Sequence, residues 1–248
     1  MQLFVASCLS HQQNRLFSGL MDLVGARLGV TIEATAPETA DIVYRCGLPS
    51  GRAIDLFEPW YAPVLAADRY MGLAVYFSDV VIRPGWTPRS WLDLAGTRLA
   101  YNEAGSFSGH AAIRHELRRR HLPASFFSWR QSGSHRASLD MVLSGEADLA
   151  SIDSMVLELE GPPSDSLKVF ARLGPYPMPP ISTSRNLDSA MREEAGALLA
   201  SLHDTETGRR LFDEFAVSHL SRVDDGPYRN MAKLVRGLDL SVPPPTEA

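Results

Sequence analysis

The stretch LFVASCLSHQQNRLFSGLMDLVGARLGVTI, residues 3–32, decides the fold class of this chain. Its first four residues, 3–6, form a short apolar run, which predicts a buried strand. Leucine and valine then recur at helical spacing, which predicts a helix over residues 12–28 that ends at Gly29. The β-branched residues 30–32 predict a second strand. A strand, a helix and a strand at this short spacing imply a right-handed crossover and a parallel sheet.

The alternation of strands and helices continues along the rest of the chain. Apolar runs predict further strands over residues 41–46, 72–83, 99–101, 149–152 and 169–171. Helical spacing predicts helices over residues 108–121, 138–144, 190–203, 207–219 and 228–238. We expect the proline-rich tail at 242–245 to be frayed.

Two breaks divide this series into parts. The first is Pro84-Gly85, and the second is the proline-dense stretch 174–180. Between them lies a segment with its own strands and helices. We therefore expect an α/β protein with two lobes, in which lobe I is discontinuous (1–83 plus 181–248) and lobe II is 84–180. Two lobes that are joined by two crossings can close over a ligand like a hinge.

The composition excludes several classes of protein. The chain has 248 residues, of which 45% are hydrophobic and 21% charged, as in globular proteins and unlike disordered or fibrous ones. Asp and Glu number 29 against 24 Lys and Arg, and the net charge of −5 disfavours nucleic acid as a partner. Apolar runs stay shorter than the ~18 residues of a membrane-spanning helix, so we expect no membrane insertion.

The cysteines, the histidine spacing and the N-terminal residues each exclude or disfavour one feature. Cys8 and Cys46 are too few for a disulfide scaffold or a four-thiolate zinc site, so we expect unpaired thiols. His115 has no second histidine four residues later, and we expect neither a metal site nor a cofactor.

The start at Met1 shows no basic segment, apolar segment or cleavage signal of a leader. This predicts a cytoplasmic protein, or a form of the chain without its leader.

The clearest candidate site is the turn Gly105-Ser106-Phe107-Ser108-Gly109, between a predicted strand and a predicted helix. Small residues let the backbone turn sharply and approach a ligand. The first N–H groups of a helix lack intrahelical partners and carry the positive end of the helix dipole, so they attract anions. The hydroxyls of Ser106 and Ser108 can add donors. The alternative is an ordinary helix cap without a ligand.

Two further polar residues are candidates because of their place beside predicted elements. His135 lies just before the helix at 138–144, where it can donate to an oxyanion; a surface histidine is the alternative. Asp153 follows the strand at 149–152, at the edge where open α/β sheets bind ligands. The alternative for Asp153 is that it caps the helix that follows.

Several short stretches together carry a resemblance to a known family. In chain order they are 28–30 (LGV), 40–44 (ADIVY), 47–49 (GLP), 76–83 (YFSDVVIR), 91–96 (WLDLAG), 106–109 (SFSG), 133–135 (GSH), 144–148 (SGEAD), the proline loop before Ile181, and 185–187 (RNL). Over roughly residues 1–240 the chain resembles the substrate-binding proteins of phosphonate- and phosphate-type ABC importers. The resemblance implies a type II periplasmic-binding-protein fold, in which each lobe is a mostly parallel sheet flanked by helices.

The resemblance also implies site residues and partners. The residues it assigns to the ligand are Ser106, Phe107, Ser108, His135, Tyr76, Tyr44 and Asp153. Phe107 replaces the central threonine of the family's Ser-Thr-Ser-Gly turn, which removes a hydroxyl but keeps the backbone amide. The proline loop has no acidic residue, which disfavours an aminoalkyl phosphonate as ligand. The implied partners are a small anion and an ABC permease, the implied state is a monomer, and the implied location is the periplasm.

These observations predict a non-enzymatic solute-binding protein. It would capture a small oxyanion, of the phosphonate, phosphite or phosphate-like kind, in the interlobe cleft for an ABC importer. Two alternatives stay open. One is a leaderless cytoplasmic enzyme of the same fold that resembles the chorismate dehydratases, and the other is a ligand-sensing module that acts on a protein partner.

Overall fold

The computed structural model describes residues 2–162, 166–238 and 240. The chain divides into two compact units: unit 1 is Met1–Val75 with Tyr176–Lys233, and unit 2 is Tyr76–Pro175 with Leu234–Ala248. The expected lobe boundaries, 1–83 plus 181–248 and 84–180, stay a prediction. Within the described part of the chain, every helix is too short or too polar to cross a membrane.

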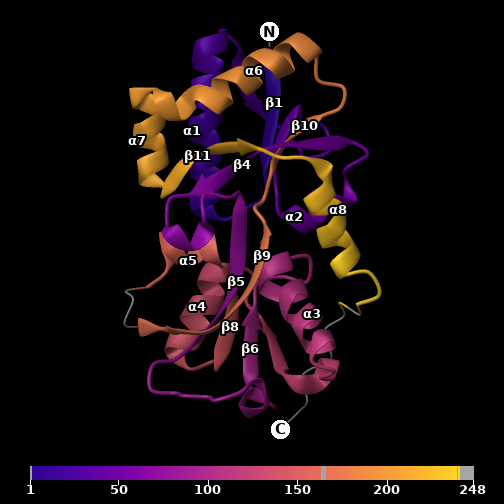
Figure 1. Ribbon diagram of the computed structural model, residues 1–248, viewed down its shortest axis with the longest axis vertical. Coiled ribbons are helices and arrows are strands. Elements are labelled where there is room, and N and C mark those ends of the chain that lie inside the picture. The colour runs from indigo at the N-terminus through magenta and orange to yellow at the C-terminus, as the bar shows by residue number, and fades with distance from the viewer. Residues whose placement is uncertain (1, 163–165, 239, 241–248) are drawn as a thin grey trace. The chain divides into compact units, whose positions relative to one another are not determined.

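Unit 1 is built on a six-stranded sheet (Figure 1). Its strands are β1 (Gln2–Ser7), β2 (Thr31–Ala34), β3 (Ile42–Tyr44), β4 (Phe57–Leu65), β10 (Ile181–Ser184) and β11 (Val217–Arg222). Its helices are α1 (His11–Leu28), α2 (Gly47–Arg52), α6 (Ser189–Ser201), α7 (Glu206–Glu214) and most of α8 (Asp225–Leu234). The strand order is β11-β4-β10-β3-β1-β2. Strand β1 pairs in parallel with β2 and β3, and the other ladders are antiparallel.

The first strand, helix and strand of unit 1 follow from the local sequence, and their prediction is confirmed. Ser10 caps α1, because its side chain accepts a hydrogen bond from the amide of Gln13 and the Gln13 side chain accepts one in return. Gly29 ends the helix with φ 64°, a left-handed conformation that favours glycine. The parallel pairing of Leu3 with Ile32 completes the unit.

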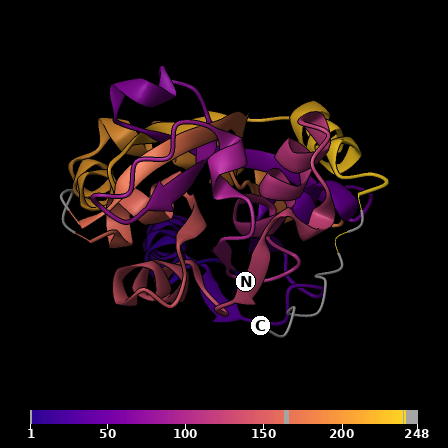
Figure 2. The same ribbon diagram turned by 90° about the horizontal axis from the view of Figure 1, so that it is seen from below.

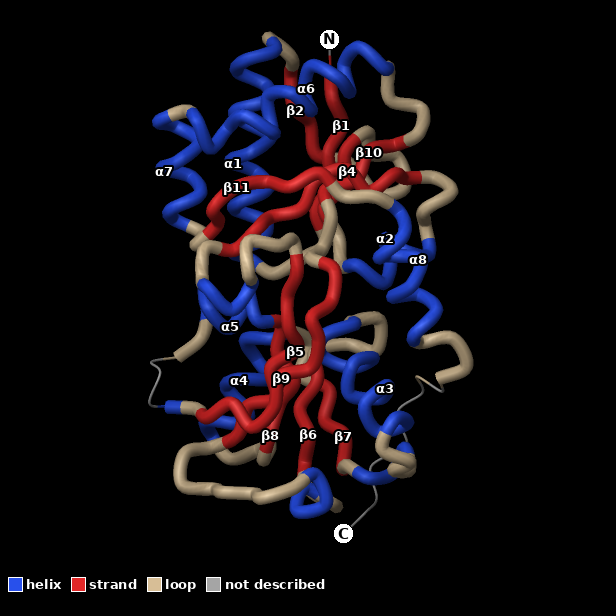
Figure 3. Tube along the Cα trace, in the orientation of Figure 1, coloured by secondary structure: helices blue, strands red, loops and turns tan. Residues whose placement is uncertain are grey.

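Unit 2 is built on a five-stranded sheet in the order β7-β6-β8-β5-β9 (Figure 3). Its strands are β5 (Val75–Ile82), β6 (Arg98–Tyr101), β7 (Ser128–Gln131), β8 (Leu149–Asp153) and β9 (Lys168–Pro177). Its helices are α3 (Ala112–Arg119), α4 (His135–Ser144) and α5 (Ser154–Glu160), and a π-helical turn, Phe107–Ala111, leads into α3. Strand β6 pairs in parallel with β7 and β8, whereas β5 and β8 are antiparallel. The helices flank this sheet (Figures 1 and 2).

An aliphatic core holds the sheet of unit 2 against α4 and α5. Its buried members are Val81, Ala100, Leu139, Val142, Ala147, Ala150, Ile152 and Val156. Each larger side chain of this kind contributes about 1.5–3 kcal/mol when it is buried. Because β6 and β8 are parallel, their carboxyl ends lie at the same edge of the sheet. The packing of α4 on both strands fixes the residues that follow this edge.

The helix predicted over 207–219 is wrong at its C-terminal end. Helix α7 ends at Glu214, Ala216 adopts a φ of 51°, and strand β11 begins at Val217. Strand β11 forms because it pairs with β4, and the sequence pattern did not predict β4 either. Pro59 and Pro63 lie inside β4, and proline normally argues against a central strand because it has no N–H to donate.

Two further expectations concern prolines. The proline-dense stretch 174–180 was expected to break the chain, but β9 continues as far as Pro177. Strand β9 lies at the edge of its sheet, where a missing N–H is tolerated. The tail at 242–245 lies outside the described residues, so its expected fraying stays a prediction.

Candidate functional site

The turn around Ser106 starts a helix, as the sequence predicts, but its first residues are π-helical. Ser106 is the cap: its Oγ accepts a hydrogen bond from the amide of Gly109 at 3.1 Å. The amide of Ala111 donates to the carbonyl of Ser106, five residues earlier, at 3.1 Å. Such π-helical turns are frequent at functional sites. The turn offers two hydroxyls and the amides of a helix start to a bound anion.

Two buried hydroxyls hold this turn against the sheet. Ser78 Oγ on β5 and Ser151 Oγ on β8 each lie 2.7 Å from the carbonyl oxygen of Ser108, and 2.6 Å from each other. Both serines are fully buried. Since each hydroxyl carries one proton, two protons serve three short contacts. The carbonyl of Ser108 is therefore held by two side chains whose strands are paired in the sheet of unit 2.

His135, the first residue of α4, contacts the turn through its side chain. Its Nε2 lies 3.2 Å from Ser108 Oγ. Burial lowers the pKa of His135 to about 4, and its interaction with the backbone of Ser151 acts in the opposite direction. The imidazole is therefore neutral near pH 7, so it can accept one hydrogen bond and donate another.

Gly109 has no room for a side chain. A Cβ atom at this position would lie 1.9 Å from Asn102 Oδ1 and 3.2 Å from His135 Cε1. Asn102 follows β6, so the end of that strand, the turn and the start of α4 come together at Gly109. The Oδ1 atom of Asn102 is buried and has no hydrogen-bond partner among the described residues.

His110 fixes the loop in front of the turn. Its ring is fully buried, and Nδ1 lies 3.2 Å from the carbonyl oxygen of Ala104. The ring packs on Tyr101, with 5.0 Å between centroids, and on the edge of Trp129, at 5.2 Å. Burial lowers the pKa of His110, and the charge of Arg114 lowers it further. A neutral His110 can donate from Nδ1 to Ala104, which orders the residues before Ser106.

The other residues predicted in this unit have different surroundings. The ring of Phe107 is fully buried. Tyr76 is fully buried on β5, two residues before Ser78. Asp153 lies opposite Ser78 and caps α5, because its Oδ1 accepts a hydrogen bond from the amide of Met155 at 2.8 Å. Capping was the alternative for Asp153, and a ligand contact there stays a prediction.

Tyr44, the predicted residue in unit 1, is fully buried at the end of β3. Its ring lies 5.7 Å from that of Phe17 on α1. Strands β1 and β3 are parallel neighbours, and the chain continues from β1 to β2 on one side and returns to β3 on the other. The carboxyl ends of two such strands form the switch point at which open α/β sheets bind ligands.

Arg45 follows Tyr44 at this switch point, and the sequence interpretation missed it. Its guanidinium lies 4.6 Å above the ring of Phe57. Its Nε and Nη2 are buried and have no hydrogen-bond partner among the described residues. Burial lowers the pKa of Arg45, while Cys8 and Glu38 act in the opposite direction. A buried guanidinium with unfilled N–H groups is suited to an anionic acceptor.

The structure thus brings three of the predicted residues, Ser106, Ser108 and His135, to one turn. Sequence reasoning missed Ser78 and Ser151 as parts of the site. Their only signal was a single serine inside each of two strands that are otherwise apolar or aromatic except for Asp79 and Asp153. The described residues contain no cluster of three or more His, Cys, Asp or Glu side chains that could hold a metal ion.

The sequence matches one protein family, described as the periplasmic substrate-binding protein of a phosphonate ABC transporter, over residues 14–228. No curated protein sequence matches the chain.

Solved structures with the same fold span nearly the whole chain. PhnD1 from Prochlorococcus marinus, in complex with methylphosphonate, is 16% identical with a TM-score of 0.81, and covers 97% of this chain and 99% of its own. A binding protein component of an ABC phosphonate transporter from Pseudomonas aeruginosa is 16% identical with a TM-score of 0.78, over 94% of this chain and 85% of its own. XAC2383 from Xanthomonas citri, bound to ATP, is 18% identical with a TM-score of 0.67, over 96% of each chain. At these identities the likeness establishes the type II periplasmic-binding-protein fold, as the sequence predicts.

Proposed function

This chain belongs to the family of periplasmic substrate-binding proteins of phosphonate ABC transporters, and we propose that it binds a small phosphorus oxyanion at the Ser106–Gly109 turn. The ligand class is phosphonate, phosphite or phosphate-like. The protein would bind it without turnover, as a monomer in the periplasm, and deliver it to an ABC permease.

One observation carries the proposal: the hydroxyl of Ser108 and the neutral ring of His135 meet at 3.2 Å beside a helix start. The oxygens of a phosphonate can accept hydrogen bonds from the hydroxyls and amides of this turn. Hydrogen bonds to a charged oxygen are roughly twice as strong as those between neutral groups. The donors named at this turn carry no charge themselves, so geometry rather than net charge would select the ligand.

Anion binding would also change the hydrogen bond that the Ser108 hydroxyl donates. The Ser108 hydroxyl has one proton, which it can donate either to His135 Nε2 or to the anion. When the Ser108 hydroxyl donates its hydrogen bond to the anion, the neutral imidazole can change tautomer and donate from Nε2 to the Ser108 oxygen or to the ligand. Ser108 and His135 would therefore act as one adaptable pair of donors.

Methylphosphonate is the first ligand to test, because a structural relative of this chain was solved with it. The experiment is a thermal unfolding series of the full chain with methylphosphonate, phosphite, phosphate and sulfate, followed by calorimetric titration of the best ligand. A ligand at 100 times its Kd stabilises the folded state by about 2.7 kcal/mol, which is a visible shift in Tm. We expect at least one phosphorus oxyanion to raise the Tm and sulfate to do so less.

The absence of any shift with all three phosphorus oxyanions at millimolar concentration would contradict the proposal. Chemical change of methylphosphonate during incubation, followed by phosphorus NMR, would contradict binding without turnover.

A further inference from the structure

Unit 1 contains a cavity of about 430 Å³ that lies along one face of α6. Ser189, Arg192, Gly196 and Ala197 line it at the spacing of successive helical turns. Trp60 and Tyr61 of β4 and Arg222, the last residue of β11, line it as well. Nothing in the oxyanion proposal uses these residues.

The wall of the cavity next to β4 is aromatic. The indole of Trp60 packs so closely on α6 that a Cβ at Gly196 would lie 2.9 Å from its Cζ2 atom. The ring of Tyr61 lies 5.2 Å from that of Trp60, at an angle of 64°. Ala197, the next residue of α6, is exposed and also lines the cavity, so an apolar body can lie against its methyl group beside the aromatic rings.

Two of the three guanidinium nitrogens of Arg192 have partners, and the third has none among the described residues. Its Nη1 lies 2.6 Å from a carboxylate oxygen of Glu58, and its Nη2 donates to the carbonyl of Ser184 at 2.8 Å. Its Nε is buried and has no hydrogen-bond partner among the described residues. A buried charged donor without an acceptor is unfavourable unless water or a ligand supplies one.

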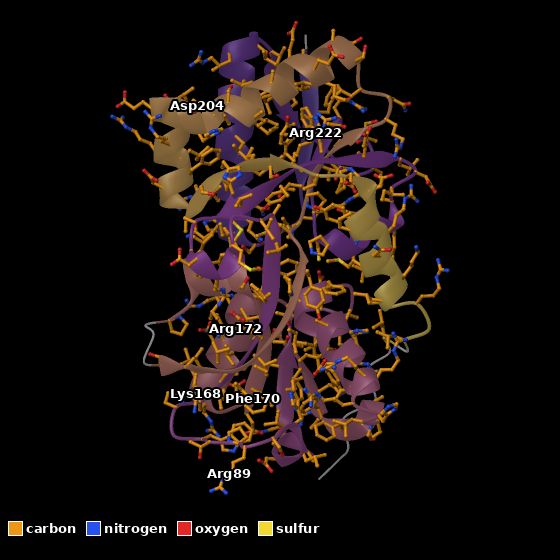
Figure 4. The ribbon with its side chains drawn as sticks, viewed as in Figure 1. Arg89, Lys168, Phe170, Arg172, Asp204 and Arg222 are labelled. Carbon is orange, nitrogen blue, oxygen red and sulfur yellow. The ribbon has the colours of Figure 1, made fainter. Side chains whose placement is uncertain are left out.

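Arg222, labelled in Figure 4, is exposed. Within the described part of the chain its side chain forms no ion pair or hydrogen bond. Arg185, the third arginine at the cavity, is already paired with Asp225 at 3.5 Å and donates to the carbonyl of Ile54 at 3.1 Å. Arg222 is therefore the guanidinium that remains available to a ligand.

We propose that this cavity is a second binding site, for a small organic acid that has one carboxylate on a flat apolar body. A carboxylate matches the parallel N–H groups of a guanidinium, so it would bind the exposed guanidinium of Arg222. The flat body would lie against Trp60 and Ala197. The carboxylate of Glu193 also lines the cavity, and its charge favours a monoanion over ligands of higher charge.

The probe is benzoate, titrated calorimetrically into the full chain. Benzamide has the same shape without the charge, and acetate has the charge without the ring. We expect benzoate to bind at least tenfold more tightly than either. Arg222→Gln should weaken benzoate binding about tenfold, and Ala197→Phe should abolish it by filling the cavity.

The matched control is Lys168→Gln, which removes one exposed positive charge from β9 in unit 2 (Figure 4). It should leave benzoate binding unchanged. The Tm of each variant shows that it is folded, and methylphosphonate binding, where present, should be the same in Arg222→Gln as in the wild type.

Three outcomes would overturn the inference. They are no heat of binding with millimolar benzoate, equal binding of benzoate and benzamide, or equal benzoate affinity in Arg222→Gln and Lys168→Gln. Since none involves the Ser106–Gly109 turn, each is distinguishable from a failure of the proposed oxyanion function.

Discussion

His135 Nε2 lies 3.2 Å from Ser108 Oγ, and this contact joins the first residue of α4 to the turn that precedes α3. Behind it, Ser78 and Ser151 hold the carbonyl oxygen of the same Ser108. The hydroxyl that faces His135 therefore belongs to a residue whose backbone is fixed.

Replacing Ser108 by alanine removes the hydroxyl of this contact and leaves the backbone of the turn in place. We expect Ser108→Ala to weaken methylphosphonate binding by about 1.5–3 kcal/mol, or roughly 10- to 150-fold, because a hydrogen bond to a charged oxygen is lost. Calorimetric titration measures this. Ser144→Ala, at the exposed end of α4, is the matched control and should bind as the wild type does. Equal affinity in both variants would remove Ser108 from the site.

The lowered pKa of His135 makes stability depend on pH. Burial brings this pKa from 6.5 to about 4, so the unfolded chain binds the proton more readily than the folded protein. The contribution is complete above about pH 6.5 and is lost as pH falls towards 4. We expect the free energy of unfolding of the wild type to fall by about 1–3 kcal/mol more than that of His135→Gln between pH 7 and pH 4.5.

Urea unfolding at a series of pH values measures this difference. His11→Gln, which removes an exposed histidine at the start of α1, is the control and should follow the wild type. If His135→Gln shows the same pH dependence as the wild type, the imidazole is not buried in its neutral form.

A methyl group at Gly109 should disturb the site through Asn102. In Gly109→Ala the Cβ would lie 1.9 Å from Asn102 Oδ1, and overpacking of this kind costs about 1–3 kcal/mol. Gly105→Ala is the control, because a Cβ there meets nothing within 4 Å. Adding Asn102→Ala to Gly109→Ala should restore much of the stability in urea unfolding. A double variant no more stable than Gly109→Ala would show that the conflict lies elsewhere.

The hydroxyls of Ser78 and Ser151 should not act independently. Each single change to alanine is expected to reduce the free energy of unfolding by about 0.5–1.5 kcal/mol, because a buried hydrogen bond is lost. Because both hydroxyls reach the carbonyl of Ser108 and also each other, the double variant should deviate from additivity by more than about 0.5 kcal/mol. A double-mutant cycle measured by urea unfolding tests this, and simple additivity would contradict the shared arrangement.

Much of the fold could be predicted because the signals are local. The helix between β1 and β2 and the cap at Ser106 depend on residues three to five positions apart. Helix α4 begins at His135, three residues before its predicted start. The prediction failed at β11, where a helical pattern continued into a strand. Strand β11 depends on pairing with β4, and the residues of that ladder are distant in the sequence.

The amino-acid sequence by itself determined the alternation of strands and helices, the family of the chain and the turn with its two serine hydroxyls, because periodicity, caps and motifs lie within a few residues of one another. The tertiary structure decided which groups meet that turn. Ser78 and Ser151 are 30 and 43 residues away from Ser108 in the chain, and His135 is 27 residues away. Such contacts depend on how β5, β8 and α4 pack around a common core, and no local pattern of residues records that packing.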